Sequence, residues 1–272
     1  MAKMSRTSAY KSAISRTMGS STEVNQQKAG EVLDRLLFPD GVPANLTMGQ
    51  VLVGVAKVAE KNAETFEAAE RFLATERSED RRRRVMRDDA LADLRLVLIK
   101  ARGAIVNFWG EFAAQDVGFV GTTPETAEQL LSYARNIREK LGQGFDGYEV
   151  DMPSDLDLGR PDPANLATAI EARATALEQA VNAYGVEERE TQAALNARDK
   201  AEAQWSTHYS PVASIIEGLF RLAEMPELAE RVRPTARRRA GLVEEADLGE
   251  LEGEAEFDVE SREPQDDADI VV

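Results

Sequence analysis

The sequence predicts an all-α protein, and three observations support this prediction. Every apolar run long enough to be read repeats with the 3.6-residue period of an α-helix. Aromatic residues make up only 6% of the chain, which favours helices packed through Ala and Leu over a β-sandwich. Residues 54–112 also align without a gap on residues 165–223, with 12 identities in 59 positions. This self-resemblance indicates one helical unit used twice.

The expected architecture is a pair of duplicated antiparallel helical hairpins that form an up-down four-helix bundle. An extra helix lies between the copies, and the termini are expected to be disordered. Residues 31–141 hold the first hairpin and the connecting helix, residues 142–163 form a loop rich in Pro, Gly and acids, and residues 164–240 hold the second hairpin.

Residues 1–30 are rich in Ser and Thr, lack a sustained apolar period and carry no acid before Glu23. These features predict a flexible basic arm. Apolar residues at helical spacing then predict a short helix over residues 31–38, which ends at Pro39-Asp40-Gly41.

The first copy contains no proline between residues 44 and 123, and its apolar residues fall on one face of a helix. The pattern lapses over residues 75–84, which read TERSEDRRRR, and the second copy lapses at the equivalent residues 187–192. A hairpin tip at each lapse is the simpler interpretation. One continuous helix per copy is the alternative, because residues 75–84 contain neither Pro nor Gly.

Between the copies, Thr123-Pro124 is a typical helix start, and the apolar spacing that follows predicts a helix over residues 125–141. Residues 142–163 contain four glycines and three prolines, as expected of a loop. Within the second copy, Ser210-Pro211 predicts a kink or a new helix start.

The net charge of −16 is concentrated at the C-terminus. Residues 241–272 contain 13 acids and one base, Arg262, which leaves a charge of only −4 for the rest of the chain. This composition predicts an acidic disordered tail. The last residues, Ile270, Val271 and Val272, resemble a C-terminal ligand that a carboxylate-binding groove reads by strand addition, although such a pattern is common by chance.

The residue inventory argues against several catalytic and metal sites. The absence of cysteine excludes disulfides, thiolate nucleophiles and cysteine-ligated metals. The single histidine, His208, is too few for a ferritin-like di-iron site, and it is expected to pack its ring beside Trp205 and Tyr209. No glycine-rich phosphate-binding loop is found. We therefore expect no catalytic site, no metal and no cofactor.

Two arginine clusters are the candidate binding residues, because guanidinium groups fit phosphates. They comprise Arg81, Arg82, Arg83 and Arg84 in the first copy, and Arg237, Arg238 and Arg239 before the tail. Acids surround the first cluster and the tail follows the second, so solvated charge is the preferred interpretation and nucleic-acid binding the less favoured one.

The functional prediction is a non-catalytic scaffold or interaction protein that contacts a protein partner through its bundle face or its acidic tail. A homo-oligomer is compatible with this prediction. The alternative is a polyanion-binding protein whose arginine clusters are screened by the tail. No run reaches the roughly 20 apolar residues of a membrane span, and a cytoplasmic location is expected.

Overall fold

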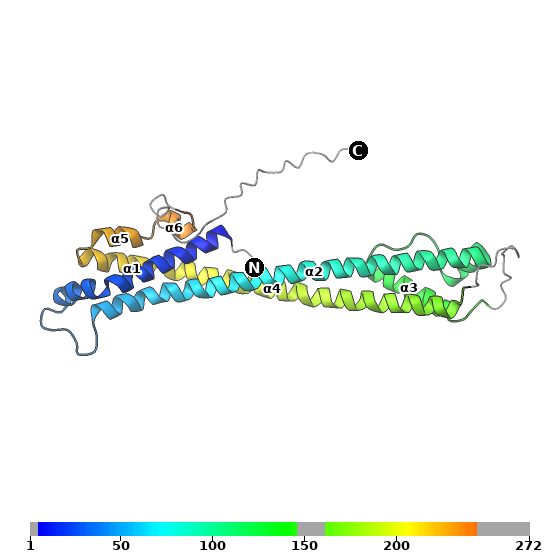
Figure 1. Ribbon diagram of the computed structural model, residues 1–272, viewed down its shortest axis with the longest axis horizontal. Coiled ribbons are helices and arrows are strands. Elements are labelled where there is room, and N and C mark those ends of the chain that lie inside the picture. The colour runs from blue at the N-terminus through cyan, green and yellow to red at the C-terminus, as the bar shows by residue number, and fades with distance from the viewer. Residues whose placement is uncertain (1–4, 146–160, 244–272) are drawn as a thin grey trace, which may run out of the picture. The chain divides into compact units, whose positions relative to one another are not determined.

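The computed structural model describes residues 5–145 and 161–243, and these ranges contain helices and no strand (Figure 1). The predicted all-α class is therefore confirmed. The helices are α1 (Arg6–Leu37), α2 (Met48–Val117), α3 (Ala127–Leu141), α4 (Pro163–Leu222), α5 (Pro226–Val232) and α6 (Ala236–Ala240). Among these helices, none has an apolar stretch long enough to cross a lipid bilayer.

The chain forms two compact units. Unit 1 consists of Ala69–Lys200, and unit 2 combines residues 5–68 with residues 201–243. The division falls inside α2 and again inside α4. This grouping differs from the two consecutive hairpins that the sequence predicts, because each unit contains part of both long helices.

The hairpin tips predicted at residues 75–84 and 187–192 are wrong. Both stretches are helical and lie inside α2 and α4, so the alternative of one continuous helix per copy describes them correctly. The two helices run antiparallel, since Glu70 pairs with Arg198 whereas Arg83 pairs with Glu187. Each polar stretch therefore packs beside the other, and Glu and Arg are good helix formers that need no turn.

Two further positions show how the long helices depart from simple expectation. α4 continues through Pro211, where the sequence predicts a kink or a new start. α2 instead changes direction at Gly110, whose φ of 83° and ψ of 172° are not helical. Glycine adopts this backbone geometry readily because it has no Cβ. An ion pair of 2.8 Å from Arg102 to Glu111 spans the break.

The flexible arm predicted for residues 1–30 is also corrected, because α1 occupies residues 6–37. Ser5 caps the helix by accepting a hydrogen bond from the backbone N–H of Ser8 at 3.1 Å. The buried face of α1 is unusually polar, and its hydroxyl groups are partly satisfied within the helix. The Ser15 hydroxyl donates to the Lys11 carbonyl, and the Thr22 hydroxyl donates to the Met18 carbonyl.

In unit 2, α1 lies alongside the beginning of α2 and the end of α4 (Figure 1). The centre of this core is Trp205, which stacks on Tyr209 with ring centroids 4.7 Å apart. Its indole N–H donates to Ser15 Oγ at 2.9 Å, and the Lys11 ammonium group lies 5.1 Å from its ring centroid. Lys11 in turn donates to Glu202 Oε1 at 2.5 Å. Aromatic packing and a paired cation thus attach α1 to α4.

In unit 1, α3 packs against the end of α2 and the beginning of α4 (Figure 1). Trp109 stacks on Phe145 at a centroid distance of 4.4 Å. Two ion pairs on the surface join α3 to α4, one between Arg135 and Glu178 at 2.8 Å and one between Arg138 and Glu171 at 3.3 Å. The buried apolar side chains include Leu94, Leu98 and Ile105 of α2, Leu130 and Ile137 of α3, and Ile170 and Leu177 of α4.

Burial follows the same offset of 111 residues as the sequence alignment. Positions paired by that offset are buried in both segments at Ala63 and Ala174, Phe66 and Leu177, Leu94 and Trp205, Leu98 and Tyr209, Ile105 and Ile216, and Trp109 and Phe220. If the two segments are copies of one unit, that unit is one long helix rather than a hairpin. The duplication itself stays a prediction.

The close crossing of α1 and α2 leads to a first testable prediction. A Cβ atom at Gly49 would lie 2.6 Å from the backbone oxygen of Gln26, so Gly49→Ala forces the helices apart. We expect a loss of about 1–3 kcal/mol in the free energy of unfolding, measured by urea denaturation. Gly54→Ala is the matched control, because nothing lies within 4 Å of its added Cβ. Better helix propensity should make that control neutral or more stable by up to about 1 kcal/mol, and equal losses in both variants would refute the crossing.

Candidate functional site

Three glutamates from the two long helices come together in unit 1. Glu76 of α2 and Glu187 and Glu190 of α4 each place a carboxylate oxygen within 4.8 Å of the other two. Glu76 is 9% exposed and Glu187 is 5% exposed, whereas Glu190 faces solvent. The cluster is thus partly buried between helices and open on one side.

The antiparallel packing of α2 and α4 explains why these residues meet. The offset of 111 pairs Glu76 with Glu187 and Glu79 with Glu190. When two related segments run in opposite directions, equivalent positions come close only near their common midpoint. The glutamates lie at that midpoint, where the apolar pattern of both copies lapses.

The surroundings of Glu187 are strongly acidic. Its pKa is raised from the ordinary value, first by burial and then by the negative charges of Glu79, Glu76 and Glu190, while Arg83 acts in the opposite direction. The Arg83 Nε atom lies 3.8 Å from Glu187 Oε2, which is too long for a hydrogen bond.

Two buried oxygen atoms in this region have no hydrogen-bond partner. They are Glu187 Oε1 and, one helical turn further along α4, Thr191 Oγ1. Unsatisfied buried polar atoms are rare in native proteins and cost about 1–3 kcal/mol each. A positively charged group or a proton would therefore stabilise an unpaired carboxylate oxygen that lies beside further carboxylates.

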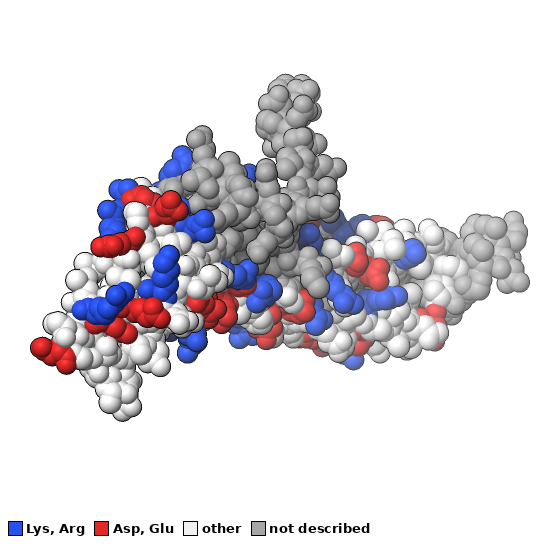
Figure 2. Space-filling view, turned by 60° about the vertical axis from the view of Figure 1, so that its left-hand side comes forward, with Lys and Arg blue, Asp and Glu red and all other residues white. Residues whose placement is uncertain are grey.

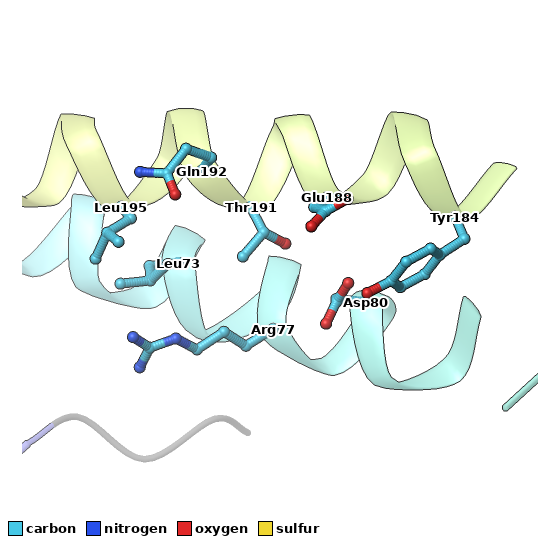
Figure 3. Close-up of a pocket in the computed structure, with 8 residues that line it drawn as sticks. All are labelled: Leu73, Arg77, Asp80, Tyr184, Glu188, Thr191, Gln192 and Leu195. Carbon is cyan, nitrogen blue, oxygen red and sulfur yellow. The ribbon is translucent and has the colours of Figure 1, made fainter. Parts of the chain in front are cut away.

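A shallow pocket of about 190 Å³ lies between the same stretches of α2 and α4, although none of the three glutamates lines it (Figure 3). Leu73, Arg77 and Asp80 line it from α2, and Tyr184, Glu188, Thr191, Gln192 and Leu195 line it from α4. The Tyr184 ring extends from α4 to the level of Asp80 (Figure 3). The volume of the pocket is below the roughly 300–1,000 Å³ that is typical of small-molecule sites, so only a small ligand would fit in it.

The first arginine cluster is exposed at all four positions, Arg81 to Arg84. Arg83 forms the long ion pair with Glu187, and the nearby Arg87 lies over the Tyr184 ring at 4.5 Å while it pairs with Asp88. Basic and acidic side chains are interspersed over the face shown in Figure 2. Arg81 to Arg84 thus form an exposed basic stretch of helix α2 with acidic side chains around it.

The second arginine cluster makes local structural contacts. The buried Arg238 side chain donates to the backbone carbonyls of Glu230 and Arg233, at 3.2 and 3.0 Å. Arg237 donates to the Val243 carbonyl at 3.0 Å, and Arg239 to the Thr235 carbonyl at 3.4 Å. These bonds stabilise α6 and the residues on either side of it.

His208 differs from its expected position. It is exposed, and its Nδ1 atom lies 3.0 Å from the Asn62 amide nitrogen. Trp205 and Tyr209 stack on each other without it, because adjacent residues on a helix point in directions about 100° apart. The other predicted terminal features, namely Ile270, Val271, Val272 and the acidic tail beyond residue 243, lie outside the described residues.

The glutamate cluster is not among the candidate residues that the sequence singles out. The signal that could have revealed it is the pairing of identical glutamates at an offset of 111. Its interpretation required knowledge that α2 and α4 are antiparallel and continuous through the polar stretches.

Comparison with known proteins provides no relative from which to assign the site: no protein-family model, curated protein or solved structure matches this chain.

Proposed function

We propose that this chain is a non-catalytic helical scaffold that binds a protein partner through an exposed apolar seam on α2 in unit 1. A cytoplasmic location belongs to the same proposal and is compatible with the absence of cysteine. The observation that supports the interaction role is the presence of two apolar stripes on one stretch of helix.

The exposed seam consists of Val85, Ala92, Leu96 and Ile99, with the exposed Gly103 one turn further. These residues are spaced by seven, four, three and four positions, which is the spacing of one face of a coiled-coil helix. The side chains are largely accessible, since Val85 is 53%, Leu96 is 49% and Ile99 is 52% exposed. Nothing lies within 4 Å of the position that a Cβ at Gly103 would occupy.

The buried seam of the same stretch consists of Leu94, Leu98, Ala101 and Ile105, which pack in the core of unit 1. With 100° of rotation per residue, the exposed seam lies on the opposite side of the helix, about 180° away. Core packing therefore does not explain the second seam. A single helix with two apolar faces is typical of a segment that contacts a further helix.

An amphipathic helix of a partner protein is the occupant that fits this surface. Regular 3.5-residue spacing allows knobs-into-holes packing, and Gly103 allows a close approach of the partner backbone.

The proposal is tested by site-specific cross-linking. A photoreactive residue in place of Leu96 should give a discrete cross-linked protein in cells of the source organism, and the same residue in place of the exposed Glu128 of α3 should not. The double variant Leu96→Asp with Ile99→Asp should remove the cross-link made by a probe at Val85. Its melting curve should stay unchanged, because exposed substitutions usually alter stability by no more than about 0.5 kcal/mol.

Three outcomes are informative. A cross-link to a second copy of the chain would identify the partner as the protein itself and would be accompanied by a change in sedimentation. Equal cross-linking from residues 96 and 128 would indicate random collision. Absence of any discrete product from residue 96 would refute the seam as a binding surface.

A polyanion-binding function is the second candidate, and the exposure of Arg81, Arg82 and Arg84 favours it. If it applies, a chain ending at residue 243 should bind heparin in a strongly salt-dependent manner, and the triple change of these arginines to Gln should abolish binding. Weak binding by both forms at physiological salt would reject this candidate.

A further inference from the structure

We infer that Glu76, Glu187 and Glu190 form a binding site for a hard divalent cation, best matched by Ca²⁺, between α2 and α4 in unit 1. The convergence of three carboxylates and the unpartnered, buried oxygen of Glu187 are separate observations, and together they support this site. The inference is independent of the proposed partner seam.

The chemistry of the ligands selects the class of ion. All three residues offer carboxylate oxygens, and hard cations such as Ca²⁺ and Mg²⁺ prefer oxygen ligands. The cluster contains no His or Cys, so the softer transition metals lack their preferred ligands. A divalent charge also offsets most of the negative charge that three neighbouring carboxylates concentrate in one place.

The flexible coordination of calcium suits this site better than that of magnesium. Calcium accepts six to eight oxygens in irregular arrangements, whereas magnesium requires a nearly ideal octahedron and usually keeps several waters. The carboxylate oxygens of the cluster lie within 4.8 Å of one another, which is close enough for one calcium ion to contact all three residues. The exposed Glu190 leaves the outer side of the site open to water, which completes the six to eight ligands that calcium takes.

The existing cation is too distant to replace a bound ion. Arg83 is the basic group in an ion pair with Glu187, and it approaches Oε2 only to 3.8 Å. Its side chain is 46% exposed, so solvent screens the interaction. Glu187 Oε1 still has no hydrogen-bond partner, although the residue is 5% exposed. A bound cation would satisfy that oxygen directly.

The test uses the full chain, freed of metal with EDTA and titrated with CaCl₂ in a calorimeter at pH 7.5 and 0.15 M KCl. We expect one Ca²⁺ per chain and weaker binding of Mg²⁺. Glu187→Gln and Glu76→Gln should each weaken calcium binding by at least about tenfold, since even residues that only orient a metal ligand contribute that much. The matched control is Asp89→Asn, which removes one negative charge from an exposed position of α2 and should leave binding unchanged.

Thermal unfolding supplies a second measurement, which shows whether the variants remain folded. In EDTA, Glu187→Gln should melt at a higher temperature than the unchanged protein, because it removes repulsion among the carboxylates. Addition of CaCl₂ should raise the melting temperature of the unchanged protein and of Asp89→Asn, and should raise that of Glu187→Gln by less.

The inference would be overturned by the absence of calcium uptake at millimolar concentration, which would indicate that a proton neutralises the cluster. Equal binding by Glu187→Gln and the unchanged chain would place any bound calcium elsewhere. Equal weakening by Asp89→Asn and Glu187→Gln would show that calcium binds only as a diffuse counterion.

Discussion

Deletion of residues 1–28 is expected to destabilise unit 2 severely. The deletion removes three buried apolar side chains, those of Tyr10, Ile14 and Met18, and each contributes about 1.5–3 kcal/mol when fully buried. It also removes Lys11 and Ser15, which contact Trp205. Differential scanning calorimetry should show that the melting transition of unit 2 moves to much lower temperature or disappears.

The matched control for this deletion is a chain that ends at residue 243. The tail that it lacks is rich in acids and poor in apolar stripes, so its removal should leave both melting transitions nearly unchanged. An N-terminal deletion that melts like the control would show that α1 contributes little to the core. It would restore the interpretation of residues 1–30 as a flexible arm.

Replacement of Trp205 by alanine should lower the free energy of unfolding of unit 2 by about 3–5 kcal/mol, the usual cost of truncating a large buried aromatic residue. Trp205 is 1% exposed and stacks on Tyr209, so neighbouring helices cannot collapse easily into the cavity. The Ser15 hydroxyl also loses the indole N–H that donates to it. Urea denaturation followed by circular dichroism measures this loss.

Two substitutions separate the contributions to that effect. Trp205→Phe keeps an aromatic ring against Tyr209 and removes the indole hydrogen bond, so an intermediate loss is expected. Gln204→Ala changes the exposed neighbour and should be close to neutral. A loss below about 1 kcal/mol for Trp205→Ala would mean that the residue does not anchor α1 to α4.

The sequence predicts the all-α class correctly because the apolar period persists through most of α2 and α4. It fails at residues 75–84, where an apolar lapse suggests a turn. Charged residues such as Glu and Arg have high helix propensity, so a polar stretch without Pro or Gly can remain helical when a neighbouring helix packs beside it. The position of that neighbour is information that the local sequence does not contain.

The error at α1 has a different cause. Residues 6–30 are rich in Ser and Thr and poor in large apolar side chains, and a segment of that composition is typically disordered. In the folded chain small residues allow close packing, as at Gly30, whose added Cβ would lie 2.9 Å from the Gly49 nitrogen. The hydroxyls of Ser15 and Thr22 also donate hydrogen bonds to backbone carbonyls of α1. Burial of these two side chains therefore costs little free energy.

The glutamate cluster combines both kinds of information. The identity of Glu76 and Glu187 at the same offset is visible in the sequence, and so is the polar lapse around them. Their convergence depends on the antiparallel, unbroken course of α2 and α4, which the hairpin interpretation excluded. Prediction of the cluster therefore requires both the choice of continuous helices over hairpin tips and the antiparallel direction of α2 and α4.

The discontinuity of unit 2 has a consequence for how the chain is made. The described part of unit 1 comes from one stretch of sequence, Ala69–Lys200, and can fold while synthesis of the chain is still in progress. In unit 2, the contact between Ser15 and Trp205 forms only after Trp205, 190 residues later, has been synthesised. Domains generally fold as units in the order of their synthesis, so the middle of this protein precedes its ends.

Folded unit 1 also makes the later folding of unit 2 easier. Its two chain ends are joined by the ion pair between Glu70 and Arg198 at 2.8 Å, so residues 68 and 201 are held near each other once it has folded. The loop that must close for α1 to meet α4 is then effectively short. A shorter loop loses less conformational entropy when it closes. Folded unit 1 thus acts as a template that brings the two segments of unit 2, residues 5–68 and 201–243, close to each other.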